Sequence, residues 1–358
     1  MRFFAGINVV ISLLLSVVAL SSCSPQDRYI EFSGFAQGGA YTVKMNLKGR
    51  DGMIKSRPQE IKDSVDAILG RVDASLSGYN KKSLLSRFND GQKIVPDEMF
   101  LDIYEKAYDV CKDTDGVVDA ASAALFDIWG FGFKNGEMPD DERVAEVLGS
   151  CGFKRLSRGI RAVYETEGTV GAGDLLEDAS GTLVKLNYNA LAQGYSCDKV
   201  AEYLYGIGVK DMMVDIGEIF CDGVNPSGKE WGIGIDRPVD GNNSPGSDLQ
   251  AVFRVPKGPH GVVTSGNYRK FYVKDGKKYA HTIDPRTGYP VTHNLLSATI
   301  LAADGFTADA YATYCMVVGL EESVRFIEST PEIEGCLVYD DNGEFKTWTS
   351  SGMTLSGL

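Results

Sequence analysis

Several familiar catalytic signatures are missing from this sequence of 358 residues, and their absence narrows the possible functions. There is no phosphate-binding GxxxxGK(S/T) loop, no GxSxG nucleophile turn, no HExxH zinc motif, and no GxGxxG fingerprint opening a helix after a strand. Histidine is scarce, with only 3 in the chain. A histidine-rich metal site is therefore not expected. Any metal should be held by oxygen ligands, which suit a hard cation such as Mg²⁺.

Positive charge is also in short supply. The 36 lysines and arginines face 49 aspartates and glutamates, which gives a formal net charge of −13. Such a chain repels nucleic-acid phosphates, so we expect no nucleic-acid partner. The 7 cysteines include no CxxC pair. Beyond the first of them, buried free thiols are the favoured interpretation, and a disulfide stays open in an oxidising compartment.

Only one long apolar run exists, from Val9 to Leu20, and it is too short to span a bilayer comfortably. Arg2 precedes it, and Leu20-Ser21-Ser22-Cys23 closes it, as in a secretory signal. The closing tetrapeptide resembles the lipobox of bacterial lipoproteins, although a plain secretory signal is the alternative. We therefore predict a signal peptide over 1–22 and a lipidated tether over 23–31, beginning at Cys23. The mature protein would face the periplasm or cell exterior from a membrane anchor.

Hydrophobic periodicity separates helices from strands along the rest of the chain. Helices are predicted over 57–77, 97–111, 189–205, 307–318 and 320–327. A strand or hairpin is predicted over 29–46, and strands over 183–186, 212–220, 231–235 and 297–303. The glycine- and asparagine-rich stretches 168–181 and 240–248 suggest exposed loops. Because helices and strands mix without a regular βαβ rhythm, the predicted fold class is α+β.

Five short segments occur in an order and spacing that together carry a resemblance. They are Leu76–Asn80; Asp115–Asp119 leading to Trp129–Gly132; Asn189–Tyr195 with Asp198; Thr264–Arg269 continuing to His281–Gly288; and Ala308–Thr313. With them, the chain resembles the FAD:protein FMN transferases, also called ApbE-type flavin transferases, from about Phe32 to Gly352. A flavin transferase domain is therefore predicted over 32–358.

The resemblance implies a T-fold-like flavin transferase architecture in which mixed sheets pack with helices. It implies FAD as the substrate and Mg²⁺ as the cofactor. A hydroxyl of an acceptor protein attacks the FMN-side phosphorus, and AMP leaves. Acceptors in the family are flavoprotein subunits of extracytoplasmic redox complexes. Two alternatives stay open: an FAD pyrophosphatase that gives FMN and AMP, and a lipoprotein that binds FAD without cleaving it.

The family's metal ligands correspond to the Asp309 carboxylate, the Thr313 hydroxyl and the backbone carbonyl of Ala190. Asp309 and Thr313 are four residues apart, so in a helix their side chains share one face. Asp309 is expected in the first turn, where a carboxylate also suits the helix dipole. The resemblance makes His281 the candidate base for the incoming hydroxyl, because histidine titrates near neutral pH.

Flavin contacts are implied at seven positions: Gln37, Tyr79, Val118, Asp119, Asn187, Gln193 and Ile283. Trp129 is expected in the core. Three of the contact positions depart from the family, with Gln37 replacing a methionine, Asn187 an aspartate and Gln193 a lysine. Gln193 keeps hydrogen-bond donors but loses a positive charge. In a helix starting near Asn189, Gln193 would share a face with Ala190. We therefore expect a variant but active enzyme.

Overall fold

The computed structural model describes residues 28–131, 138–156, 159–177, 181–239, 246–267, 271–274 and 277–356. Cys23 and the predicted signal peptide lie outside the described residues. Within the described part of the chain, no helix has the length and apolar character needed to cross a membrane.

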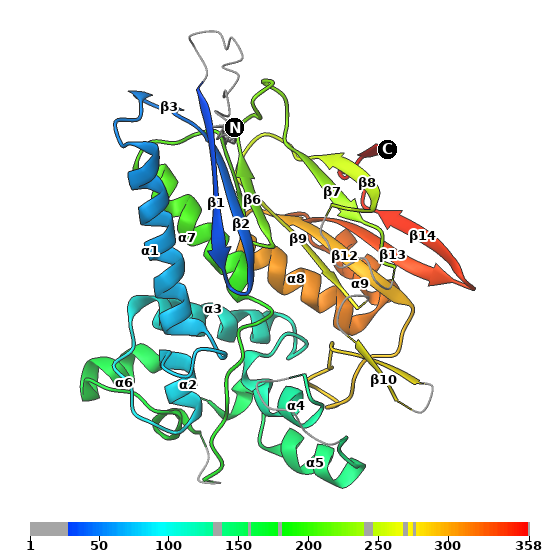
Figure 1. Cartoon of the computed structure of the whole chain (residues 1–358). Helices are drawn as coiled ribbons and strands as arrows, with labels where there is room; N and C mark the ends of the chain where they lie inside the picture. The colour runs from blue at the N-terminus through cyan, green and yellow to red at the C-terminus, as the bar shows by residue number, and fades with distance from the viewer. Residues whose placement is uncertain are drawn as a thin grey trace, which may run out of the picture.

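An eight-stranded sheet forms the centre of the molecule (Figure 1). Its order is β1-β2-β5-β6-β9-β12-β13-β14, and each neighbouring pair is antiparallel. The strands are β1 (Tyr29–Ala36), β2 (Gly39–Asn46), β5 (Met212–Asp215), β6 (Ile219–Asp222), β9 (His260–Gly266), β12 (Leu295–Ala302), β13 (Glu334–Asp341) and β14 (Glu344–Thr349). Smaller sheets join β15 (Leu355–Ser356) to β8 (Leu249–Arg254) and β7 (Gly232–Asp236), β10 (Phe271–Lys274) to β11 (Lys277–Ala280), and β3 (Lys48–Gly49) to β4 (Gly52–Met53).

The hairpin predicted over 29–46 is confirmed. Its tip is the pair Gln37 and Gly38, whose φ angles are 51° and 81°. Two central residues with positive φ give a turn whose twist matches the strands that it joins. The side-chain amide Nε2 of Gln37 also donates a hydrogen bond to Ser196 Oγ. This bond fixes the hairpin tip to a helix from another part of the chain.

Helices cover the sheet and extend beyond it. α1 (Pro58–Leu76) and α7 (Ala192–Gly206) pack with β2 and β5 in one apolar cluster, while α8 (Gly305–Val318) lies within the largest cluster. The remaining helices are α2 (Leu84–Asn89), α3 (Glu98–Asp113), α4 (Ala123–Ile128), α5 (Asp141–Gly149), α6 (Ile160–Glu167) and α9 (Leu320–Ser329). In Figure 1, α2 to α6 gather below the sheet. Short 3₁₀ turns are η1 (Ala120–Ser122), η2 (Phe153–Arg155) and η3 (Ala172–Leu175).

The start of α8 lies against α7 with almost no space between the two backbones. A Cβ atom on Gly194 would stand 2.1 Å from the carbonyl oxygen of Gly305. The Asp198 carboxylate of α7 accepts hydrogen bonds from the N–H groups of Gly305 at 2.7 Å and Phe306 at 2.8 Å. These contacts fix where α8 begins relative to α7, and therefore where its polar side chains lie.

Four predicted elements need correction. Residues 183–186 form no strand. Instead, Leu186 exchanges two backbone hydrogen bonds of 2.8 Å with the Asn89 side chain, which takes the place of a neighbouring strand. Residues 212–220 are parts of two strands, β5 and β6, because the chain turns at Gly217 with a φ of 91°. The stretch 168–181 includes η3 and the fully buried Val170, so it is not simply an exposed loop.

The fourth correction concerns the helix predicted from residue 189, which begins at Ala192. Asn189 and Ala190 form the turn before it. The helices predicted over 57–77, 97–111, 307–318 and 320–327 and the strand over 297–303 are confirmed, with ends that differ by a few residues. Buried free thiols are confirmed at Cys111, Cys151, Cys197, Cys221, Cys315 and Cys336.

Candidate active site

Asp309 is a buried carboxylate on α8, with 4% of its surface exposed. Its Oδ2 accepts a hydrogen bond from the N–H of Gly194 at 3.1 Å. Asp304 is the N-cap of α8, so Asp309 lies beyond the first turn of the helix. The prediction that Asp309 lies within the first turn is therefore wrong. Thr313 is one turn further on and half-buried. The two side chains share a face of the helix, as expected from their spacing.

Burial raises the pKa of Asp309 to about 7, and the negative charge of Asp198 adds to this, while the Gly194 hydrogen bond opposes it. A cation beside Asp309 would favour the charged carboxylate. The described residues contain no group of three or more histidines, cysteines or acids able to hold a metal. A single carboxylate with a nearby hydroxyl instead fits a hard cation that takes few protein oxygens, such as Mg²⁺.

The turn before α7 brings Ala190 into the same region. The N–H of Gly194 donates to Asp309 instead of to Ala190, four residues earlier. This leaves the carbonyl of Ala190 without the helical partner that it would have inside α7. The carbonyl is thus available as an oxygen ligand close to the residue that binds Asp309.

A pocket of about 840 Å³ lies between the β1–β2 hairpin tip, α1 and the start of α7. This volume is in the range of small-molecule sites. We call it the hairpin pocket. Three of the seven predicted flavin-contact residues line it: Gln37, Tyr79 and Gln193. Tyr79 is 65% exposed and offers a ring for stacking. These residues are separated in sequence, and the fold brings them together.

Gln193 is held in place within the hairpin pocket. Its Nε2 donates to the carbonyl of Ile216 at 2.9 Å. Gly217 has a φ of 91°, which favours glycine, and a Cβ atom there would lie 2.5 Å from that Nε2, so the Gln193 side chain would have to move. Because Ala190 precedes α7, the expectation that Gln193 and Ala190 share one helical face is wrong.

Asn187 and Asn189 link the hairpin pocket to the segment around Asp119. The Nδ2 of Asn189 donates to the Tyr79 hydroxyl at 3.3 Å. Asn187 is 9% exposed, its N–H donates to the carbonyl of Ala120 at 2.7 Å, and its Oδ1 accepts from the N–H of Asn189 at 2.9 Å. The Tyr79 contact was missed by the sequence interpretation, since nothing local to Asn189 points to a residue 110 positions away.

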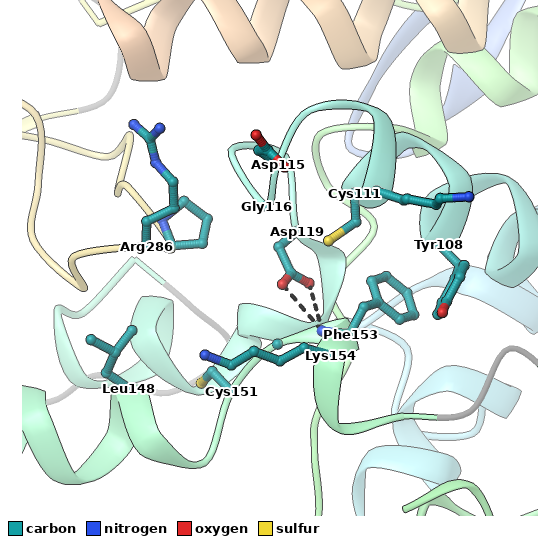
Figure 2. Close-up of a pocket in the computed structure, with 13 residues that line it drawn as sticks. Tyr108, Cys111, Asp115, Gly116, Asp119, Leu148, Cys151, Phe153, Lys154 and Arg286 are labelled. Atoms are coloured by element: carbon teal, nitrogen blue, oxygen red, sulfur yellow. Dashed lines mark hydrogen bonds between the residues drawn. The ribbon is translucent and has the colours of Figure 1, made fainter. Parts of the chain in front are cut away.

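Val118 and Asp119 lie away from the hairpin pocket. Val118 is buried in the main core. The Asp119 carboxylate accepts from the N–H of Ala121 at 2.8 Å and of Phe153 at 3.1 Å, and burial raises its pKa. Its side chain faces a second pocket of about 490 Å³ (Figure 2). The Asp119 side chain therefore holds two loops together beside this second pocket.

His281 follows β11 directly and is half-buried, with its ring edge-on to Phe131 at a centroid distance of 6.5 Å. Ile283 is 1% exposed and bridges to Pro290. The turn after it is fixed because Trp129 Nε1 donates to the Gly288 carbonyl at 2.7 Å. Trp129 is 6% exposed and packs in an apolar cluster with Ile283, which confirms its expected place in the core.

The fold and site together define an α+β protein in which an oxygen-donor site adjoins a ligand-sized pocket. Residues 37–337 match the ApbE family model, and the chain belongs to the ApbE family. It is 31% identical to the FAD:protein FMN transferase of Haemophilus influenzae, covering 98% of this chain and 96% of that protein. It is 32% identical to the enzyme of that name from Escherichia coli K12, covering 84% and 82%.

Solved structures agree with the sequence comparisons. The apo form of the Pseudomonas stutzeri flavinyl transferase ApbE superposes with a TM-score of 0.74 at 28% identity, over 91% of this chain and 96% of that one. The flavin transferase ApbE from Vibrio cholerae gives 0.72 at 27% identity, over 91% and 98%. The predicted α+β flavin transferase architecture is therefore confirmed.

Proposed function

We propose that this protein transfers FMN from FAD to a hydroxyl group of an acceptor protein and releases AMP. Relatives that match most of the chain carry the name FAD:protein FMN transferase. The observation that carries the proposal is the Gly194–Asp309 hydrogen bond. This bond joins the buried Asp309 carboxylate of α8 to Gly194 of α7. The residue before Gly194 is Gln193, which lines the hairpin pocket. A cation held there would lie next to bound substrate.

Asp309, Thr313 and the carbonyl of Ala190 are the residues that would hold Mg²⁺. When bound, the ion would offset negative charge on the diphosphate, which is the main requirement of phosphoryl transfer. The chain's own contribution is to bind and orient FAD. Gln193 and Tyr79 line the pocket that would receive it, and Gln37 secures the hairpin tip above.

His281 would accept the proton of the acceptor hydroxyl at a ring nitrogen. As that proton leaves, the hydroxyl oxygen forms a bond to the FMN-side phosphorus, and the bond from this phosphorus to the AMP oxygen breaks. Phe131 packs against the imidazole and limits its orientation.

The protein is further proposed to be a lipoprotein, with the signal peptide 1–22, the tether 23–31 and the transferase domain 32–358. The sequence Leu20-Ser21-Ser22-Cys23 supports this proposal. The site would then face the periplasm or cell exterior, where acceptor flavoprotein subunits of redox complexes would be reached from the membrane.

The test is incubation of the protein with FAD, Mg²⁺ and extracytoplasmic proteins of its host. We expect flavin fluorescence to appear on an acceptor band in a denaturing gel, together with one AMP per flavin transferred. Free FMN and AMP without a labelled band would instead identify a pyrophosphatase. Intact FAD after incubation would identify a binding protein and contradict both enzymatic functions.

A further inference from the structure

A narrow turn, residues 282–291, directly follows the candidate base. Its two arms are joined where the N–H of Val291 donates to the carbonyl of Thr282 at 3.1 Å. Closer to the tip, the N–H of Asp284 donates to the carbonyl of Tyr289 at 3.0 Å. Because the arms are joined, a contact that holds the tip of the 282–291 turn also limits where the imidazole at its start can lie.

Trp129, which ends α4, holds this tip. Its Nε1 donates to the carbonyl of Gly288 at 2.7 Å, in a buried hydrogen bond, and its ring lies against Tyr289 with centroids 5.9 Å apart. The Tyr289 hydroxyl donates to Asp141 of α5 at 2.7 Å. A Cβ atom on Gly288 would stand 2.9 Å from Val144, also in α5. The tip therefore lies against both helices.

The segment that holds the tip also contacts the imidazole. Phe131 comes two residues after Trp129, and its N–H donates to the carbonyl of Phe126 in α4 at 2.9 Å. The Phe131 ring lies edge-on to the His281 ring, at a centroid distance of 6.5 Å. Residues 129–131 therefore contact this part of the chain at two points, the tip of the turn and the base itself.

The start of the turn is tied to the central sheet. Thr282 Oγ1 donates to Oδ1 of Asn267 at 2.6 Å, and Asn267 directly follows β9. With its start tied to β9 and its tip tied to Trp129, the turn has little freedom to shift. A buried carbonyl that loses its donor is costly, so removal of the indole N–H should make the tip at Gly288 move toward another partner.

We propose that Trp129 is a positioning residue for the transfer reaction, which holds the 282–291 turn so that His281 meets the acceptor hydroxyl in a productive orientation. The Tyr289–Asp141 bond assists it. The proposal rests on the transferase function proposed above, with His281 as the base. FAD binding should not depend on Trp129, because this side chain is not among those that line the hairpin pocket.

The test variant is Trp129→Phe, which keeps an aromatic ring and removes the indole N–H. Trp231→Phe is the matched control. Trp231 is 5% exposed, compared with 6% for Trp129, and its Nε1 donates to the carbonyl of Asp222 at 2.9 Å. It packs in a different apolar cluster, with β7 and β8. The two substitutions therefore remove the same kind of contact, and only one of them adjoins the candidate base.

Both variants are assayed with FAD, Mg²⁺ and extracytoplasmic proteins of the host, by the initial rate of flavin labelling in a denaturing gel. We expect Trp129→Phe to lower the rate at saturating FAD roughly tenfold and to leave the KM for FAD unchanged, since orientation of the base is lost and substrate binding is not. Trp231→Phe should keep the wild-type rate and KM. Equal rates in the two variants, or a raised KM in Trp129→Phe, overturn the proposal.

A double variant tests whether Trp129 acts through the imidazole. If it does, Trp129→Phe should change the residual labelling rate of His281→Ala by less than about twofold, because there is no base left to position. A further tenfold loss in the double variant would show that Trp129 acts by another route, and would overturn the proposal.

Melting temperatures show whether each variant is folded in the assay. If Trp129→Phe is not, Tyr289→Phe carries the test, because it removes only an exposed hydrogen bond from the same turn. We then expect a labelling rate about threefold lower at unchanged KM, and a wild-type rate overturns the proposal. A normal rate in His281→Ala would overturn both the proposal and the assignment of the base. FAD left intact by the wild type with Mg²⁺ would instead contradict the transferase function itself.

Discussion

At the scale of single residues, Asp309 decides what the site can bind. A carboxylate with 4% exposure is costly to keep charged, and the Gly194 hydrogen bond compensates only in part. Burial raises its pKa accordingly. A cation nearby would remove this cost, so the feature that is unfavourable in the free protein becomes useful when metal and substrate arrive together.

We predict that Asp309→Ala lowers the rate of Mg²⁺-dependent FAD cleavage about a hundredfold or more, because several kcal/mol of charge stabilisation are lost. Chelation with EDTA should have the same effect on the wild type. The measurement is AMP release over time. Asp51→Ala, at an exposed aspartate in the turn between β3 and β4, serves as the control. Near-normal turnover of Asp309→Ala, or of the wild type in EDTA, would contradict the assignment.

Gln193 is one of two positions, with Asn187, at which the family resemblance implies that this chain has lost a charge. It lines the hairpin pocket and donates to the Ile216 carbonyl, a bond that a lysine could also make. We predict that Gln193→Lys lowers the KM for FAD by up to about fivefold at low salt, corresponding to about 1 kcal/mol or less at a partly solvated site. The gain should diminish at higher ionic strength.

The control for Gln193→Lys is the melting temperature, because burying the new charge would reduce stability instead of improving affinity. If the fold is intact and the KM at low salt does not change, then Gln193 does not face the FAD phosphates. The assignment of the hairpin pocket to FAD would then need revision.

At the scale of secondary-structure elements, the contact of α7 with α8 positions the site. The two backbones approach so closely at Gly194 and Gly305 that no side chain fits between them. This approach lets the N–H of Gly194 reach Asp309 and lets Asp198 bind the start of α8. A glycine in a helix usually costs stability, and here the close approach explains it.

We predict that Gly194→Ala destabilises the protein by about 3 kcal/mol or more, because its Cβ would meet the Gly305 carbonyl oxygen at 2.1 Å. Gly206→Ala is the matched variant at the other end of α7, where an added Cβ would have nothing within 4 Å. It should be neutral or stabilising by up to about 1 kcal/mol. Urea unfolding of both variants tests the pair. Equal stabilities would show that the helices can separate without cost.

At the scale of the whole molecule, the proposed anchor determines which acceptors can be reached. We predict that Cys23→Ala abolishes lipidation and leaves either an uncleaved precursor or a soluble form. Intact-mass spectrometry of the membrane fraction from expressing cells measures the lipid directly. Wild-type protein without lipid would contradict the proposal, whereas the activity of a soluble form that starts after Cys23 should be retained.

Much of the fold could be predicted because it follows local patterns. The helices 57–77 and 97–111 carry apolar stripes that match one buried face, and the hairpin 29–46 has a glycine-rich tip. The segment 183–186 was mispredicted for the same reason. Val184 and Leu186 are fully buried, as in a strand, but the Asn89 side chain takes the hydrogen bonds that a neighbouring strand would take. Local periodicity does not distinguish the two cases.

The candidate site could be predicted as a set of residues but not as an arrangement. The sequence motifs predicted Asp309, Gln193 and Asp119 as residues of one site. In the structure Gln193 lines the hairpin pocket, while Asp119 faces the second pocket and stabilises loops there.

The sequence by itself determined the acidic character, the candidate signal peptide 1–22 before Cys23, most helices and the family. Each of these depends on composition or on residues that are close along the chain. Only the tertiary structure decided which distant groups meet, such as Gly194 with Asp309 across 115 positions and Asn189 with Tyr79 across 110. The reason is physical: such contacts depend on how closely α7 and α8 pack and where loops cross the core, and no local pattern specifies either.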